Sequence, residues 1–455
     1  MSEPKTSRSD GRPDARRATS RRARRAGTVG LIAVLTWASC AIWNSVKPLP
    51  PGTHVSSLPA RLAESQVDFI DDDSHHSTTL KREFEAIGRA EQLIVLDLCP
   101  LAHELAEQLL LRKRQRPNLK IVLVTDPRNE VYGGTPAQTL SILETAGIIV
   151  ARTRLALLRD SDPLYSSLWR LGIGWWSDPF DEVPGETTLI SELRRRNLKA
   201  NQRQLLVADD GAGGWTSIVM SAASGGAAAT AKVGLEIRGP LARDIVASEL
   251  RIAAWSTDDD RLPVAPPTMG RGVGTIDARF LTEGAIHAAL RDVIAITGSG
   301  DSISVLMGTF DDRQMVNAML RAAARGVRLQ LVLDPAFPGT RAAAGELVHD
   351  AAGNVEVRWQ AAAAPTEARY ALIRHRNDVW INLGSANFTH RDLDDLNLEA
   401  DVELHMPART APARAAAELF SREWSSAAAY ADYADESAAT YWRYRLADVT
   451  GLAMF

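Results

Sequence analysis

The stretch that decides the fold is Gly384-Ser385-Ala386-Asn387-Phe388-Thr389, followed by His390-Arg391-Asp392-Leu393 and by Asn397-Leu398-Glu399. It comes directly after two β-like runs, Tyr370–Ile373 and Val379–Leu383, and it precedes a third, Asp401–Leu404. A Gly-Ser-x-Asn turn at the end of a strand presents backbone N–H groups, a hydroxyl and an amide, which can hold an anionic oxygen. We therefore expect Gly384, Ser385 and Asn387 to form a phosphate-binding turn.

The bulk composition is that of a globular protein without a resident cofactor. The chain has 455 residues, of which 45% are hydrophobic and 24% are charged, enough for one large domain or two ordinary ones. The net charge of −4 argues against a general nucleic-acid binder. No His, Cys and carboxylate cluster has metal-site spacing, so we predict no metal and no cofactor. The two cysteines, Cys40 and Cys99, predict no disulfide.

The N-terminal region predicts a membrane anchor. Eight arginines precede the apolar run Val29–Val46, and a helix of about 19 residues spans roughly 28 Å, close to the thickness of a hydrocarbon core. We expect a basic cytoplasmic tail (1–27), a transmembrane anchor or signal sequence (28–46) and a Pro-rich spacer (47–54). By the positive-inside rule the rest lies outside the cytoplasm, on the periplasmic side of a bacterial inner membrane crossed once. A cleaved signal peptide, ending near Ala38-Ser39-Cys40, is the alternative.

The remainder of the chain repeats one order of elements twice. In the first half, β-like runs at Leu93–Leu98 and Ile121–Val124 alternate with helical spacing, and the second run ends in Thr125-Asp126-Pro127. In the second half, Ile303–Met307 and Leu329–Leu333 do the same. This alternation predicts an α/β fold with a largely parallel sheet and helices on both faces. We expect two repeats, 55–257 and 273–455, joined by a linker at 258–272 and related by a pseudo-twofold axis that brings their turns to one cleft.

Two segments carry a family resemblance: Asn201–Asp209 and the run from Gly384 to Glu399. From about Val55 onward the chain resembles two-repeat proteins of the phospholipase D-like superfamily, especially the membrane-anchored bacterial branch. In that superfamily an H-x-K-x-x-x-x-D strand precedes each G-S-x-N turn. The resemblance implies cleavage or exchange of phosphodiesters, in which one histidine attacks phosphorus, the other protonates the leaving oxygen, and lysines and asparagines hold the phosphate.

This sequence departs from the motif at its reactive positions. In the first repeat the positions read Gln202, Gln204 and Asp209, so only the aspartate remains. The second repeat allows two registers. Family spacing back from Gly384 selects Tyr370, Leu372 and Asn377, and a looser register selects Glu367, Arg369 and Arg374; we favour the first, because the spacing from strand to turn is geometric. Ser221, Glu236 and Glu399 are expected to support the two turns.

The missing histidines decide the functional expectation. A glutamine cannot usefully attack phosphorus, and Tyr370 lacks a neighbouring cation that would lower its pKa. His390 is the best remaining titratable group, although a solvated helix start is the commoner role for such a residue. We expect a degenerate phospholipase D-like envelope protein that recognises anionic phospholipid headgroups, does not bind nucleic acid, and has weak or no hydrolysis. The alternatives are an active phospholipase D or cardiolipin-synthase-like phosphatidyltransferase, and a structural envelope scaffold; the sequence names no protein partner.

Overall fold

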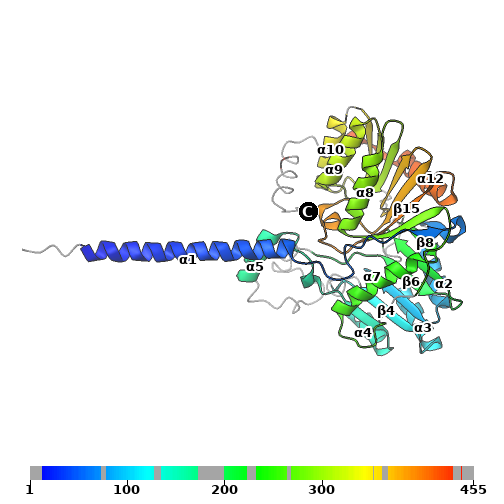
Figure 1. Cartoon of the computed structure of the whole chain (residues 1–455), viewed down its shortest axis with the longest axis horizontal. Coiled ribbons are helices and arrows are strands. Elements are labelled where there is room, and N and C mark those ends of the chain that lie inside the picture. The colour runs from blue at the N-terminus through cyan, green and yellow to red at the C-terminus, as the bar shows by residue number, and fades with distance from the viewer. Residues whose placement is uncertain are drawn as a thin grey trace, which may run out of the picture.

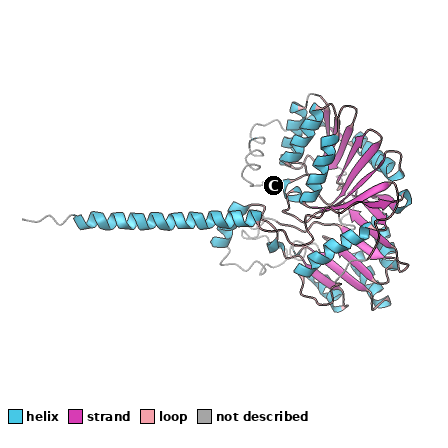
Figure 2. Cartoon of the chain, viewed as in Figure 1, coloured by secondary structure: helices cyan, strands magenta, loops and turns pink. Residues whose placement is uncertain are grey.

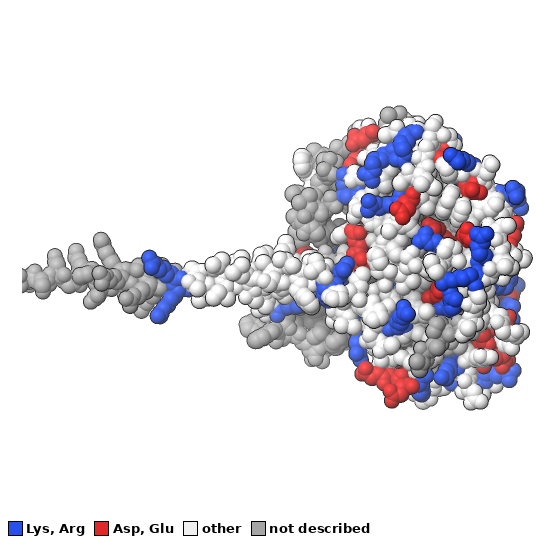
Figure 3. Space-filling view, viewed as in Figure 1, with Lys and Arg blue, Asp and Glu red and all other residues white. Residues whose placement is uncertain are grey.

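The computed structural model describes residues 13–72, 78–127, 135–172, 199–222, 232–263, 268–351, 353–360, 367–433 and 442, and side chains from 24 onward. Figure 1 shows a long helix, α1 (Pro13–Val46), that projects from a body of two sheets with helices packed on them. Within α1, Arg24–Val46 is long and apolar enough to cross a membrane, and only 6% of its most apolar stretch is buried in the body. Figure 3 shows this helix as an uncharged rod with basic residues where its described surface begins.

The first repeat forms a seven-stranded mixed sheet in the order β2-β8-β7-β6-β3-β4-β5. Its strands are β2 (Val67–Asp72), β3 (Leu93–Asp97), β4 (Lys120–Thr125), β5 (Ile149–Arg152), β6 (Leu205–Asp209), β7 (Trp215–Met220) and β8 (Lys232–Arg238). The helices of this repeat are α2 (Thr78–Arg89), α3 (His103–Gln115), α4 (Ala137–Thr145), α5 (Pro163–Leu171) and α7 (Leu241–Ser256). Only β3, β4 and β5 run parallel; the other pairs are antiparallel.

The second repeat forms a nine-stranded sheet in the order β1-β9-β15-β14-β13-β10-β11-β12-β16. Its strands are β1 (Ala60–Leu62), β9 (Ile276–Thr282), β10 (Ser302–Met307), β11 (Arg328–Leu333), β12 (Val355–Trp359), β13 (Tyr370–His375), β14 (Asp378–Gly384), β15 (Ala400–Pro407) and β16 (Ala428–Ala429). Its helices are α8 (Gly284–Ile296), α9 (Arg313–Ala324), α10 (Pro338–Asp350), α11 (His390–Leu393) and α12 (Ala411–Ser426).

The expectation of largely parallel sheets is wrong for this fold. In the second sheet only β10, β11 and β12 are parallel, while β13, β14, β15 and β9 form antiparallel pairs. The physical reason is that strands joined by a short hairpin, such as β13 and β14, must run antiparallel, whereas parallel pairs need a crossover helix. The α/β class and the repeated order of elements are confirmed.

The core consists of one inner layer and two outer layers. Alternate residues of β6 show why: Leu205 and Val207 join the inner core, whereas Leu206 and Ala208 join the outer core under α2, α3 and α4. The inner core contains α7 and α12 together with the facing sides of both sheets. The outer core of the second repeat lies under α8, α9 and α10. Because the strands are buried on both faces, their sequences are continuous apolar runs. Figure 2 shows the two sheets facing one another with helices around them.

One strand crosses the expected domain boundary. β1 follows the anchor in sequence, yet it pairs with β9 of the second sheet, with Ala60 opposite Ala278. Ser57 N also donates to Phe280 O at 3.0 Å. The segment 55–62, which the sequence assigned to the first repeat, therefore packs on the second. The free cysteines Cys40 and Cys99 form no disulfide.

Candidate functional site

The turns that end β7 and β14 are equivalent and adjacent. Ser385 Oγ accepts a hydrogen bond from Ala400 N at 3.0 Å, and Ser221 Oγ accepts one from Val233 N at 3.1 Å. β7 contacts both β14 and β15. In addition, Gln202 N of the first repeat donates to Leu398 O of the second at 2.9 Å. The structure therefore places the ends of β7 and β14 at the junction of the repeats, and residues 223–231 of the first turn lie outside the described residues.

The strand ladders give the register of the motif positions directly. Leu205 pairs with Val219, two residues before Ser221, and Tyr370 pairs with Leu383, two residues before Ser385. Leu205 thus corresponds to Tyr370, so that Gln202 corresponds to Glu367 and Gln204 to Arg369. This is the looser register. The β13–β14 hairpin is longer than the family spacing assumes, and residues counted back from Gly384 therefore fall too far along the strand.

The three residues of the favoured register do not gather at the turn. Tyr370 is 1% exposed, and its hydroxyl donates to Ala416 O of α12 at 3.1 Å. Burial raises its pKa well above the usual value for tyrosine, so it cannot serve as a phenolate nucleophile. Leu372 shares the inner core with Tyr370. Asn377 lies in the hairpin between β13 and β14, where its carbonyl accepts from Ala408 N at 2.8 Å.

Gly384 is required by a close approach of two strands. A Cβ atom at this position would lie 2.1 Å from Ala400 O and 2.3 Å from Asp401 Oδ1. The absence of a side chain lets Ser385 enter the neighbouring ladder, where its N–H donates to Ala400 O at 3.1 Å. Real Cβ contacts are never this short, so the glycine fixes the turn geometry sterically.

The hydrogen-bond donors of the turn are already bonded to neighbouring carboxylates. Ala386 N donates to Asp401 Oδ1 at 3.1 Å, and Asn387 N donates to Asp392 Oδ2 at 3.2 Å. Ser385 Oγ donates to Glu399 Oε2 at 2.5 Å. These are the groups that the sequence assigned to a phosphate. In this arrangement the carboxylates of the chain occupy that role, so an anion at the turn must use side chains around it.

The carboxylates below the turn are strongly perturbed. Burial, reinforced by the charge of Asp392, raises the pKa of Glu399 well above its usual range. Burial also raises the pKa of Asp401 to about 7, against the opposing hydrogen bond from Ala386 N. Such shifts are typical of functional sites but also of buried structural networks. Here burial is the largest cause of both shifts.

Two cations lie near the second motif: Arg369 stands in the slot of a missing lysine, and Lys232 lies beside Glu367, which stands in the slot of a missing histidine. Arg369 Nη1 donates to Ser385 O at 2.6 Å, which places the guanidinium against the turn. Lys232 Nζ lies 3.5 Å from Glu367 Oε2 across the junction of the repeats. The Lys232 side chain is 14% exposed and the Glu367 side chain 43% exposed. The junction thus offers positive charge next to the equivalent of a catalytic slot.

The remaining predicted residues have structural partners. Gln204 Nε2 donates to Cys99 O at 2.5 Å. Asp209 accepts from the backbone N–H groups of Gln92 and Leu93 at 2.9 and 2.8 Å, which ties β6 to the start of β3. Glu236 is 3% exposed and accepts from Arg82 Nη1 at 3.0 Å.

Glu236 does not match Glu399 in the repeat. Since Val233 corresponds to Ala400, Glu236 corresponds to Glu403, and Lys232 corresponds to Glu399. Glu236 and Glu403 both receive an arginine, Arg82 and Arg279 respectively, at 3.0 Å. Glu399 therefore supports its turn by accepting from Ser385 Oγ, whereas Glu236 accepts from Arg82.

A buried ionic network that the sequence did not reveal joins the repeats. Arg203 is 0% exposed and lies on the strand face opposite Gln204. Its guanidinium contacts Glu249 Oε1 of α7 and Glu283 Oε1 of the second repeat, both at 2.6 Å. Glu283 Oε1 also accepts from Glu399 N at 3.1 Å. Nothing in the sequence around Glu283 signals this role, since its partners lie far away in the chain.

Histidines and aspartates gather behind the turn. Asp312, His390 and Asp394 offer donor atoms that all lie within 4.8 Å of one another, a grouping with the donor types that divalent metals use. His390 Nδ1 lies 2.7 Å from Asp394 Oδ2, and His287 Nδ1 lies 3.2 Å from Asp394 Oδ1. The sequence predicted no metal site, because Asp312 and His390 belong to distant segments. Both histidines are hydrogen-bonded to Asp394, and neither occupies a motif slot.

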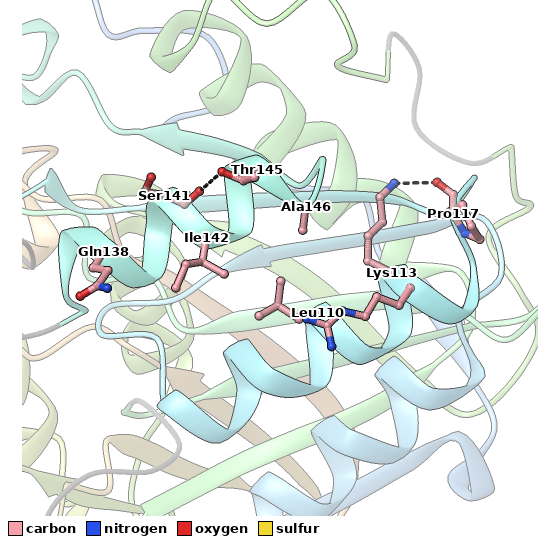
Figure 4. Close-up of a pocket in the computed structure, with 9 residues that line it drawn as sticks. Leu110, Lys113, Pro117, Gln138, Ser141, Ile142, Thr145 and Ala146 are labelled. Carbon is pink, nitrogen blue, oxygen red and sulfur yellow. Dashed lines mark hydrogen bonds between the residues drawn. The ribbon is translucent and has the colours of Figure 1, made fainter.

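A separate surface groove of about 600 Å³ lies between α3 and α4. Figure 4 shows Leu110 and Ile142 facing each other across it, with Lys113 bonded to Pro117 O at 2.9 Å. No residue predicted from the sequence as part of the site lines this groove. It belongs to the outer helices of the first repeat and not to the junction of the repeats.

Comparisons with known proteins find a family match in the second repeat and solved structures of similar fold. Residues 293–424 match the family described as cardiolipin synthase, PLD-like domain. The crystal structure of phosphatidylserine synthase from Haemophilus influenzae Rd KW20 has a TM-score of 0.55 at 12% identity, with 86% of this chain and 95% of that chain covered. Nuc of Salmonella typhimurium, a phospholipase D family member, has a TM-score of 0.28 at 21% identity and covers 34% of this chain and 98% of its own. No curated protein matches the chain by sequence.

Proposed function

Because this chain belongs to the phospholipase D-like superfamily, we propose that it is a phospholipid-headgroup-recognising member that has lost hydrolysis. One observation carries the proposal. The ladder register puts Gln202 and Gln204 in the reactive slots of the first repeat, and Glu367 and Arg369 in those of the second. Two imidazoles are needed for attack and for protonation of the leaving group, and none stands in these four positions.

Phosphate recognition is supported by the cations that remain. Arg369 lies against the turn through its bond to Ser385 O, and a guanidinium presents donors that match phosphate oxygens. Lys232 Nζ lies 3.5 Å from Glu367 Oε2, so an incoming phosphodiester competes with the Glu367 carboxylate for this ammonium. Asn387 is half-buried beside them, and its side-chain oxygen accepts from Thr309 N at 3.1 Å. A headgroup phosphate bound here would therefore contact side chains and not the backbone of the turn.

The anchor supports a place for this activity at the membrane. The part of α1 that is apolar enough to cross a membrane is Arg24–Val46, and the side chains of Arg24 and Arg25 at its start are exposed. An arginine-rich flank stays on the cytoplasmic side, so the body lies on the outer side of the inner membrane. Because the body is tethered to the membrane, a headgroup-binding site at the junction of the repeats would search for its lipid along the membrane surface and not through the bulk solution.

The experiment uses the full-length protein in detergent and in vesicles. We expect no turnover of phosphatidylglycerol, cardiolipin or a chromogenic phosphodiester above the buffer blank. The detergent-solubilised protein should bind short-chain phosphatidylglycerol, and Arg369→Gln should weaken this binding about tenfold, because one charge-assisted contact is lost. Arg328→Gln is the matched control, since Arg328 is 62% exposed on the opposite end of its sheet from the turn. Turnover comparable to that of an intact homologue would reject the proposal, and so would equal binding by the two variants. Absence of lipid binding by the wild type would support a scaffold role instead.

An active enzyme is the second candidate, and the placement of Glu367 favours it. This carboxylate occupies a nucleophile slot and is 43% exposed, and Lys232 reduces its repulsion of an anionic diester. Carboxylates serve as nucleophiles in other enzyme classes. This candidate predicts a covalent phospho-adduct on Glu367, seen by mass spectrometry after acid quench with substrate. It also predicts that Glu367→Gln abolishes the adduct.

A further inference from the structure

A short helix packs directly against the membrane anchor. α5 contacts α1 extensively, and Trp37 Nε1 of α1 donates to Leu164 O of α5 at 2.9 Å. Asp160 N, just before α5, donates to Asn44 O at 3.0 Å. Figure 1 shows α5 beside the part of α1 nearest the body. The helix is therefore held against the anchor at two levels.

The outward face of α5 is apolar and lacks a protein partner in the described structure. Leu164, Leu168 and Leu171 are 44%, 56% and 50% exposed. Their spacing of four and three residues puts them on one face of the helix. On the opposite face, Ser166 is 2% exposed, and Ser167, at the edge of the leucine face, is also buried, with its Oγ donating to Pro163 O at 2.7 Å. A soluble surface helix would show the reverse orientation of these faces.

The charges near α5 are neutralised locally. Arg170 and Lys199 both bind Asp160; the Lys199 Nζ to Asp160 Oδ1 distance is 2.5 Å. Burial alone would raise the pKa of Asp160, but the hydrogen bonds from Arg170 and Lys199 outweigh it and hold the pKa below its usual range. Lys47 Nζ donates to Ala156 O at 2.7 Å. Such pairing suits a site close to a medium of low dielectric constant.

The contact with Trp37 sets the depth of α5. Trp37 lies nine residues before Val46, the end of the candidate span, which corresponds to roughly 13 Å along a helix. If α1 crosses the bilayer, the start of α5 is level with acyl chains and not with headgroups. The exposed leucines then continue the lipid-facing surface of α1, where Ile42 and Trp43 are each 62% exposed.

We infer that α5 is inserted into the leaflet nearest the body, with Leu164, Leu168 and Leu171 in contact with lipid acyl chains. This inference rests on the proposed membrane anchoring by α1. α5 thereby fixes the body against the bilayer surface at a second point, as amphipathic helices do. The occupant of the leucine face is lipid because this face is continuous with the anchor. Ile142 of α4 is 48% exposed but is not continuous with it.

The test places an environment-sensitive fluorophore at single cysteines in the full-length chain. In a Cys40→Ala, Cys99→Ala background, Leu168→Cys, Ile42→Cys and Ile142→Cys are labelled and reconstituted in phosphatidylethanolamine–phosphatidylglycerol vesicles with or without doxyl lipids. We expect the label at 168 to show blue-shifted emission and quenching by doxyl lipids of at least half that seen at 42. The label at 142 should report water and resist quenching.

The outcomes separate the inference from its premise. Quenching at 42 without quenching at 168 overturns the insertion of α5 and leaves the anchor intact. A blue shift at 168 without lipid quenching means that a second copy or another protein covers the leucines, which also overturns it. Absence of quenching at 42 removes the anchor itself, and the inference falls with it.

Discussion

At the residue scale, Gly384 is the position where the fold tolerates least change. We predict that Gly384→Ala lowers the free energy of unfolding by about 3 kcal/mol, since its Cβ would meet Ala400 O at 2.1 Å. Urea unfolding of the detergent-solubilised chain measures this. Gly298→Ala is the control, because a Cβ there meets nothing within 4 Å. A loss below about 1 kcal/mol at 384 would show that the strands separate easily at the turn.

The buried carboxyl of Asp401 makes stability depend on pH in a defined direction. Its pKa is about 7 in the folded state, whereas an unfolded aspartate titrates near ~3.9. Between these values the folded state binds more protons, so the free energy of unfolding falls as pH rises from about 4 to about 7 and then levels off. Asp311, with a pKa of about 7 caused by burial and by Asp392, acts in the same direction.

We therefore predict that Asp401→Asn makes the free energy of unfolding depend less on pH. Melting temperatures measured from pH 5 to pH 8 should decline less steeply in the variant than in the wild type. The slope of the free energy of unfolding against pH should differ between the two by up to about 1.4 kcal/mol per pH unit. Asp258→Asn, at a side chain that is 91% exposed, should leave the slope unchanged. Identical slopes in the wild type and in Asp401→Asn would mean that Asp401 stays ionised in the folded protein.

At the element scale, β13 shows what the sequence could and could not predict. The apolar run Tyr370–Ile373 correctly predicted a strand, because a strand buried on both faces needs continuous apolar residues. The register of the motif could not be read, because it depends on the hairpin after β13. That hairpin contains Arg376 in the left-handed region at φ 55°, and Asp301 Oδ1 accepts from Arg376 N at 3.1 Å. Asp301 lies just before β10, far away in the chain, so no local pattern signals this length.

The turn itself was recognised, but the groups that occupy it were not. Gly384 ends β14 and Ser385 begins the turn after it, as the Gly-Ser-x-Asn pattern predicts. The partners Asp392, Glu399 and Asp401 reach the turn from the helix and strand that follow, where their side-chain directions depend on tertiary packing. The ion pair between Arg203 and Glu283 is even harder to predict from the sequence, since it joins the two repeats. Candidate chemistry could thus be placed on the right elements but not at the right atoms.

The packing of β13 on α12 gives a prediction for Tyr370. Tyr370→Phe removes only the hydrogen bond to Ala416 O, so we expect a loss of about 1 kcal/mol in the free energy of unfolding. Headgroup binding should stay within twofold of the wild type, because the ring faces the inner core. Thermal unfolding and lipid titration of the same sample check both. A tenfold loss of binding would place Tyr370 in the site and restore the register favoured from spacing.

At the scale of the whole molecule, the two repeats share one inner core and behave as one unit. The residues of this core come from both sheets, from α7 and from α12. Neither repeat alone can bury its inner face, so we predict a single cooperative unfolding transition. Fluorescence and circular dichroism, recorded on the same sample, should give the same transition. Residues 273–455 produced alone should bind a dye for exposed apolar surface far more strongly than the full chain. Two separate transitions in the full chain would mean that the repeats are independent domains.

The path of β1 has a mechanical consequence. This strand is the first to follow the anchor, yet it is hydrogen-bonded to β9 of the second sheet. The spacer before β1 is bonded to the first repeat, since Gly52 O accepts from Ser248 Oγ of α7 at 2.7 Å. Tension on the anchor is therefore shared between the two sheets. The tether is thus fastened to both halves of the body, and a pull on it does not load one repeat against the other.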